Sequence, residues 1–122
     1  MNDKDRQILD KILKYCNEVI ATNAYFHSDE SLFKDAERGF VYRNAVSMPL
    51  LQIGELSKNL SDGFVNGHRE IPWRMMARMR DFLAHHYGSI DMNTTFLTAT
   101  VDVPNVREQV LRILEGMEAD SV

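Results

Sequence analysis

A chain of 122 residues, 44% hydrophobic and 26% charged, has the size and composition of one folded domain and is too apolar to be a disordered chain. The net charge of −4 argues against a protein that coats nucleic acid, and the single cysteine, Cys16, excludes an internal disulfide. No stretch reaches the roughly 18 apolar residues that cross a bilayer, and the first residues lack the layout of a secretory signal. We therefore expect one cytoplasmic domain over residues 1–122 that does not enter a membrane.

Two long helices are expected in the first half of the chain. Apolar residues recur every three or four positions over residues 3–26 and again over residues 40–60, which is typical of amphipathic helices. Pro49 removes one backbone donor inside the second of them, so we expect a kink there. Between them, Ser28 is the expected N-cap of a short helix.

The second half begins with residues 61–70, which hold two glycines and are expected to form the one substantial loop. A helix should follow from Pro72 to about His86, and Gly88 should end it. Asp91 can cap a further helix to about residue 100. The last helix starts near Asp102 and has an apolar face formed by Val106, Val110, Leu111, Leu114 and Met117.

No run of alternating apolar and polar residues, which would indicate a strand, interrupts these helical patterns. The predicted fold class is therefore all-α, an up-and-down bundle of four to five helices.

The end of the helix that starts at Pro72 holds the residues with the most chemistry, Arg80, His85 and Tyr87. At 100° per residue, Arg80 and Tyr87 share one edge of the apolar sector of this helix. His85 lies about 140° around from Arg80 in an ideal helix. The two can meet only through the length of Arg80, a loosened last turn, or contact with another subunit.

These residue types fit a site that acts on a phosphodiester. An arginine can hold phosphate oxygens and offset charge in the transition state, and a histidine can transfer protons. RNA supplies its own nucleophile, the 2′-hydroxyl, so the reaction requires neither a metal nor a cofactor. The structural alternative is that Arg80 pairs with Asp81 or another acid while His85 and His86 merely end a helix.

Other residues near this segment admit two interpretations each. Glu55 could hold Arg80 or His85, or could be an exposed helix acid, and His86 could be a second base or a surface residue. Trp73 is expected to anchor the start of its helix, although bound bases could stack on it if it is exposed. Four methionines are expected to fill the core or an interface: Met75, Met76, Met79 and Met92.

The segment RDFLAHHY, residues 80–87, has the spacing Arg-x4-His-x-Tyr and resembles the signature of HEPN-superfamily ribonuclease toxins of the HepT-like group. The resemblance extends over most of the chain. It includes LQIGE at residues 51–55, EIPW at residues 70–73 and YGSID at residues 87–91, in the family's order and spacing.

This resemblance implies a metal-independent endoribonuclease toxin in which Arg80 and His85 are catalytic and the product carries a 2′,3′-cyclic phosphate. It also implies a homodimer whose two motifs face each other, and a cognate minimal nucleotidyltransferase antitoxin of the MntA-like kind that silences the toxin by AMPylation of Tyr87. Asp81 stands where the superfamily commonly has asparagine, which weakens the expectation of full activity. The alternative is a non-catalytic helical module that binds the nucleotidyltransferase and is modified by it.

Overall fold

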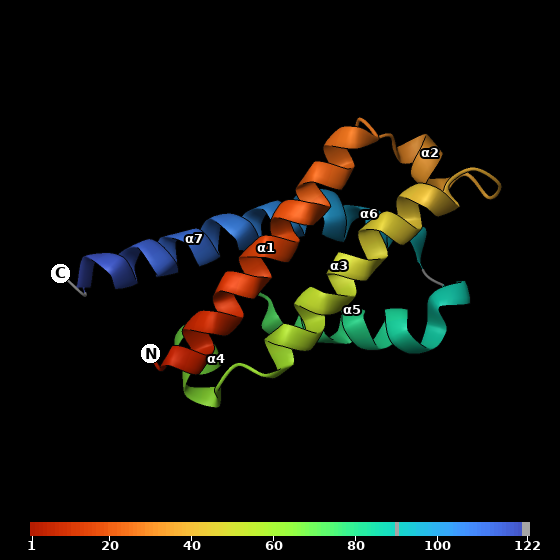
Figure 1. The fold of residues 1–122 in the computed structure, drawn as a ribbon. Coiled ribbons are helices and arrows are strands. Elements are labelled where there is room, and N and C mark those ends of the chain that lie inside the picture. Colours follow the sequence, from red (N-terminus) through yellow and green to blue (C-terminus); the bar gives the residue numbers. More distant parts are fainter. Residues whose placement is uncertain (90, 121–122) are drawn as a thin grey trace.

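The structure is a computed structural model that describes residues 1–89 and 91–120, with side chains through Gly116. Over these residues it consists of helices, turns and loops and has no strand, which confirms the all-α class (Figure 1). The α-helices are α1 (Asp3–Tyr25), α2 (Glu30–Lys34), α3 (Phe40–Lys58), α4 (Asp62–Gly67), α5 (Trp73–His86), α6 (Met92–Leu97) and α7 (Val103–Asp120). A 3-10 turn, η1 (Tyr87–Ser89), follows α5, and a π-helical turn, η2 (Thr98–Asp102), joins α6 to α7.

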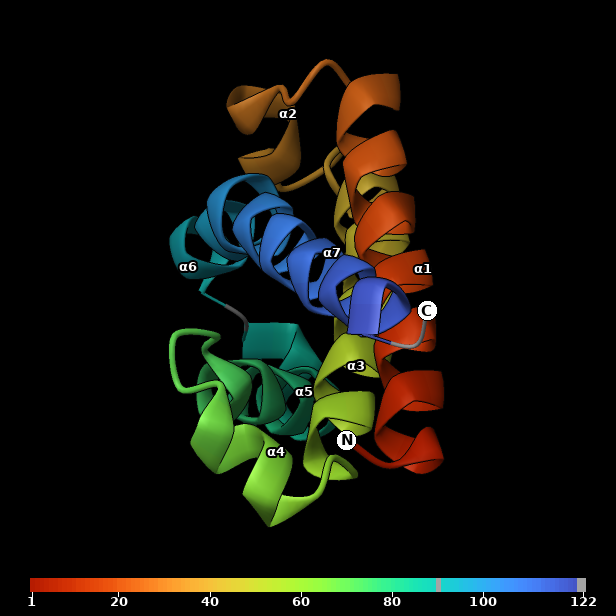
Figure 2. The ribbon, with the colours of Figure 1, turned by 90° about the vertical axis from the view of Figure 1, so that its left-hand side faces the viewer.

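The four long helices form the bundle. Helices α1 and α3 lie side by side and antiparallel, α5 packs against α3, and α7 crosses α1 on the same side of the α1–α3 pair as α5 (Figures 1 and 2). The core lies where these helices meet, and its largest fully buried side chains include Leu9, Ile12, Val19, Phe33, Tyr42, Leu50, Ile53, Met76, Val103 and Val106. The helical spacing of apolar residues therefore predicted most of the buried faces of α1 and α7. It was wrong in part for α3, where Val41 and Met48 follow that spacing and are exposed. The expected role of Met117 lies outside the side chains that the structure describes.

Helix α2 begins one residue later than the sequence suggested. His27 and Ser28 adopt left-handed backbone conformations, with φ of 55° and 48°, as the chain reverses after α1. Asp29 is extended and accepts a hydrogen bond from the backbone N–H of Leu32 at 3.0 Å. Asp29 and not Ser28 is therefore the N-cap, in the extended conformation that is typical of this position.

The expected loop over residues 61–70 was wrong in part, because it contains α4. The Ser61 hydroxyl caps this helix by accepting from the backbone N–H of Phe64 at 3.3 Å. The Asp5 carboxylate accepts from the Ser61 hydroxyl at 2.6 Å, which ties the start of α4 to α1. Phe64 is buried beside the rings of His68 and Trp73. One cap and one buried aromatic outweigh the two glycines.

The remaining elements differ in detail from the expectations. Helix α3 continues as one helix through Pro49, and α6 runs through η2 into α7 without a break at Asp102. Met76 and Met79 are buried in the core.

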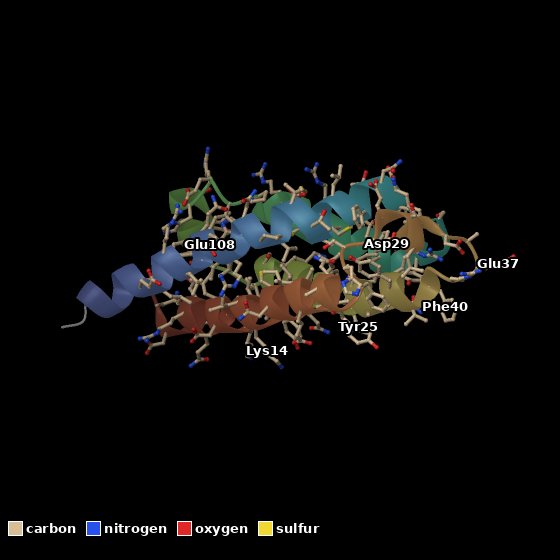
Figure 3. All side chains as sticks on the ribbon, turned by 90° about the horizontal axis from the view of Figure 1, so that it is seen from above. Lys14, Tyr25, Asp29, Glu37, Phe40 and Glu108 are labelled. Atoms are coloured by element: carbon tan, nitrogen blue, oxygen red, sulfur yellow. The ribbon has the colours of Figure 1, made fainter. Side chains whose placement is uncertain are left out.

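At the surface, Tyr25 and Phe40 project outward from the end of α1 and the start of α3 (Figure 3). No described helix combines the length and apolar character needed to span a membrane.

Candidate active site

The position of Arg80 depends on a close approach between α3 and α5. Gly54 of α3 faces α5 so tightly that a Cβ at this position would lie 2.3 Å from the Cβ of Arg80 and 2.4 Å from the carbonyl oxygen of Met76. Only glycine fits against another backbone at such a distance. The glycine of the LQIGE segment therefore sets how near Arg80 stands to α3.

Glu55, the next residue of α3, holds the Arg80 side chain. Its Oε2 lies 2.8 Å from Arg80 Nε. The Nε–H is buried and not aligned for a hydrogen bond, so this contact is an ion pair. The Arg80 side chain is 26% exposed. Of the two roles that the sequence allowed for Glu55, the structure shows the contact with Arg80 and none with His85 among the described residues.

Asp81 completes a network of four charges. Its Oδ1 accepts from Lys58 Nζ at 2.5 Å and lies 3.3 Å from Arg80 Nη1. The hydrogen bond from Lys58, with a smaller contribution from Arg80, lowers the pKa of Asp81. Lys58 was missed by the sequence reasoning, since it is 23 residues away and no local pattern links it to Asp81. The charges of Lys58, Arg80, Glu55 and Asp81 cancel.

Arg80 and His85 do not meet within one chain. Helix α5 stays α-helical to His86, and the loosening that the sequence led us to expect begins only at η1. His85 therefore keeps its angle of about 140° from Arg80. It is exposed, and among the described residues no hydrogen bond or ion pair joins it to Arg80. The His86 ring instead lies 5.7 Å from the ring of Phe82.

Tyr87 reaches from the end of α5 back to α3. It is 41% exposed, and its hydroxyl donates a hydrogen bond to Oδ1 of Asn44. Beside this contact is an open hollow of about 200 Å³ with Met48, Leu51 and Leu83 in its wall. Tyr87 is thus accessible at an apolar surface between the two helices.

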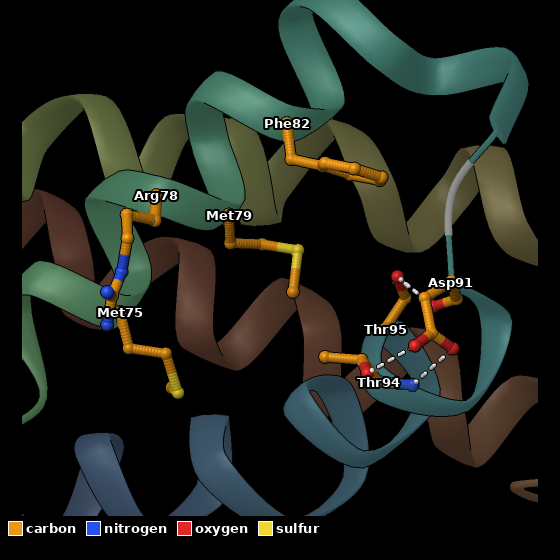
Figure 4. Close-up of a pocket in the computed structure, with 7 residues that line it drawn as sticks. All are labelled: Met75, Arg78, Met79, Phe82, Asp91, Thr94 and Thr95. Atoms are coloured by element: carbon orange, nitrogen blue, oxygen red, sulfur yellow. Dashed lines mark hydrogen bonds between the residues drawn. The ribbon is translucent and has the colours of Figure 1, made fainter.

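A second hollow, of about 270 Å³, opens between α5 and α6 (Figure 4). Met75, Met79 and Phe82 form its apolar wall, and Asp91 lies at its edge. The Asp91 carboxylate accepts a hydrogen bond from the hydroxyl of Thr94 at 2.8 Å, which lowers the pKa of Asp91. Asp91 is therefore occupied as the cap of α6. In the part of the chain that the structure describes, no group of three or more His, Cys, Asp or Glu side chains could hold a metal ion.

The arrangement places a held guanidinium, an exposed imidazole and an exposed phenol on the last two turns of α5 and the turn after it. Arg80 uses Nε and Nη1 in its contacts with the two acids. A guanidinium has five N–H donors, so Nη2 remains for an oxygen of a phosphate. Trp73 is not a base-stacking surface, because it is 4% exposed and its Nε1–H donates to the carbonyl oxygen of His68.

Comparison with known proteins agrees with this chemistry. The family model described as Ribonuclease HepT-like matches residues 6–113. A Methanocaldococcus jannaschii protein named as an RNase is 34% identical over an alignment of 126 positions that covers 100% of both chains. A Caldanaerobacter subterraneus subsp. tengcongensis protein, also named as an RNase, is 33% identical over 110 residues, 90% of this chain and 94% of its own.

A Thermococcus cleftensis protein named as a HepT ribonuclease is 46% identical over 63 residues, which are 52% of this chain and 57% of that protein. No solved structure matches the chain. The family membership favours an enzyme over the non-catalytic module. The chain belongs to the HepT-like ribonuclease family and is an endoribonuclease.

Proposed function

We propose that the chain is the toxin of a toxin–antitoxin pair and cuts RNA at a site shared by two copies, with Arg80 from one copy and His85 from the other. One observation carries this proposal. Arg80 is fixed against α3 by Glu55 at 2.8 Å, while His85 on the same helix is exposed and points elsewhere. A second copy can bring the missing histidine to each arginine.

The reaction follows from these groups and from RNA itself. The 2′-oxygen attacks the neighbouring phosphorus as its proton passes to the His85 imidazole, and the imidazolium then gives a proton to the 5′-oxygen as that oxygen leaves. Arg80 offsets the charge that gathers on the phosphoryl oxygens. The products are a 2′,3′-cyclic phosphate and a 5′-hydroxyl, and no metal or cofactor is required.

The surface for the second copy is the hollow beside Tyr87. Met48 in its wall is 62% exposed, and Val41, two turns earlier on α3, is 51% exposed. Apolar side chains that stay exposed together are typical of interfaces. Leu83 of α5 and Tyr87 of the turn after it also line the hollow, so a copy seated there lies beside the end of α5.

Tyr87 is the proposed point of control by a cognate nucleotidyltransferase. The Tyr87 oxygen attacks the α-phosphorus of ATP, the bond to pyrophosphate breaks, and AMP remains on the tyrosine. Support comes from the exposed position of the phenol, whose hydroxyl is held only at the surface by Asn44. The added phosphate is an anion that competes with RNA for Arg80.

An RNase assay of His85→Ala tests the proposed mechanism, with His86→Ala as the matched control at the next exposed histidine. We expect the first substitution to lower the cleavage rate by at least about a hundredfold, the scale of general acid–base catalysis. The control should stay close to wild type. Equal RNA cleavage rates for His85→Ala and wild type, or a wild-type chain that does not cleave RNA, would contradict the proposed mechanism.

A further inference from the structure

An arginine-lined groove of about 360 Å³ opens at the start of α5, outside the site described above. Arg69, Arg74 and Arg78 line it, and all three are exposed. No lining residue is acidic. None of the three guanidiniums lies within 4.0 Å of a carboxylate among the described side chains. Such a cluster is unexpected in a chain with a net charge of −4.

The nearby acids are engaged elsewhere. Glu70 contacts Nδ1 of His68 at 3.4 Å and lines a different hollow. Asp91 borders the hollow on the other side of Arg78, where its carboxylate accepts from Thr94. In Figure 4 the guanidinium of Arg78 lies beside Met75 and well away from Asp91. Neither acid therefore lines the arginine groove or forms an ion pair with its arginines among the described side chains.

The groove points along α5 toward the catalytic histidine. Arg74, Arg78 and His85 are spaced i, i+4 and i+11 on an unbroken helix, which places them within a sector of about 40°. The rise of the helix puts Arg74 about 16 Å from His85 along its axis. About five nucleotides of a stacked strand cover that length at about 3.4 Å per phosphate.

Asp81 lies on the same face of α5, where its carboxylate is paired with Lys58 and Arg80 and forms no ion pair with an arginine of the groove among the described side chains. The positive end of the α5 dipole adds to the potential, since the helix begins at Trp73 with no side-chain cap.

We propose that this arginine groove binds successive phosphates of the RNA strand on one side of the bond that is cut, and so leads the strand to His85. The inference rests on the proposed ribonuclease mechanism and adds the substrate class: an RNA strand that extends several nucleotides beyond the cleaved bond. Three separated guanidiniums match a chain of phosphates better than one phosphate group. A local groove also explains how an acidic protein acts on a polyanion.

Binding of a fluorescein-labelled 20-nucleotide RNA, measured by anisotropy, tests the groove. All chains carry His85→Ala so that the RNA stays intact. The test chain adds Arg74→Gln and Arg78→Gln, and the control adds Arg6→Gln and Arg38→Gln, two exposed arginines elsewhere. Both pairs change the net charge equally. A difference in RNA affinity between the two double variants would therefore come from the place of the lost charges and not from the net charge.

We expect the groove substitutions to raise Kd about tenfold and to lower the slope of log Kd against log salt by about 1.4, about 0.7 for each lost phosphate contact. The control should stay within about twofold of its parent. Equal Kd and slope in the two double variants, or no RNA binding by the parent chain, would contradict the proposal that the groove binds RNA. Equal RNA affinity is also the result expected if the groove instead meets an acidic protein surface.

The two proposals fail separately. If the wild-type chain does not cleave RNA, the catalytic mechanism is contradicted. The anisotropy experiment tests RNA binding by the groove and does not depend on cleavage.

Discussion

Gly54 of α3 lies directly against Arg80 of α5, so closely that a Cβ on Gly54 would be 2.3 Å from that of Arg80. The glycine lets Glu55 come within ion-pair distance of the arginine. The packing of the two helices and the position of Arg80, the proposed catalytic arginine, therefore both depend on Gly54.

Gly54→Ala should destabilise the protein and lower its activity together. The new methyl group would also meet the carbonyl oxygen of Met76 at 2.4 Å, so the two helices must move apart. We expect a loss of about 1–3 kcal/mol in the free energy of unfolding, as for overpacked cores, measured by urea denaturation.

The matched control is Gly116→Ala. Gly116 lies in α7 and has open space where a Cβ would be. Alanine there should leave stability unchanged or raise it by up to about 1 kcal/mol through helix propensity. If both substitutions had the same effect, close packing at Gly54 would not be the cause.

Asp81→Asn should improve RNA cleavage. The Asp81 carboxylate, whose pKa is lowered by Lys58, stays ionised at neutral pH and contacts Arg80. Its removal leaves Lys58 unpaired and Arg80 paired with Glu55 alone, so the cluster gains one positive charge that attracts phosphate. We expect KM for RNA to fall about threefold at low ionic strength, with a smaller change at high salt because exposed charges are screened.

Glu108→Gln removes an acid that pairs with Arg107 at 2.8 Å, far from the site, and should not change KM. A rise in KM for Asp81→Asn would mean that Asp81 orients Arg80 productively and does not merely compete for it.

Tyr87→Phe should abolish AMPylation and leave the RNase activity close to wild type, because the ring stays and only the acceptor oxygen is lost. Intact mass after co-expression with the cognate nucleotidyltransferase measures this. We expect additions of about 329 Da per AMP on wild type and none on the variant. The control variant Tyr25→Phe, which changes a tyrosine that is 79% exposed and keeps Tyr87, should still receive AMP. An adduct on Tyr87→Phe would place the modification elsewhere.

Cys16 should make the protein less stable at high pH. Burial raises the pKa of this thiol from 9.0 to about 12. Above pH 9 the unfolded chain loses the thiol proton while the folded chain keeps it, so the free energy of unfolding falls as pH rises toward 12. The loss attributable to Cys16 is at most about 1.4 kcal/mol per pH unit and should vanish in Cys16→Ala. A thiol that reacts rapidly with a labelling reagent in the native protein at pH 8 would contradict its burial.

The long helices could be predicted from the spacing of their apolar residues. The face that α3 buries could not, because Val41 and Met48 follow that spacing and are exposed. The helix starts depend on finer features. Ser28 and Asp29 are both good caps by residue type, and only the reversal of the chain after α1 selects Asp29. Helix α4 was missed because the contacts that stabilise it, from Asp5 and Trp73, come from distant parts of the chain.

The motif offers a set of candidate site residues, Arg80, His85 and Tyr87, but not their geometry. The contacts that hold Arg80 and Tyr87 come from α3. Nothing in the sequence around Lys58 indicates that its side chain contacts Asp81, 23 residues away. The arginine groove could not be predicted for a related reason. In the sequence Arg69, Arg74 and Arg78 are ordinary surface residues, and only the fold shows that they line one groove with no acidic residue in it.

The central claim is that each active site combines Arg80 of one copy with His85 of another, and mixing two inactive variants tests it most directly. Arg80→Ala and His85→Ala are purified separately, mixed, allowed to exchange subunits and assayed on RNA. Random exchange gives mixed dimers with one intact site, so we expect about one quarter of the wild-type activity. Adding Met48→Glu to both chains should remove this recovery by breaking the interface. A mixture that forms mixed dimers and still stays as inactive as its parts would contradict the shared site.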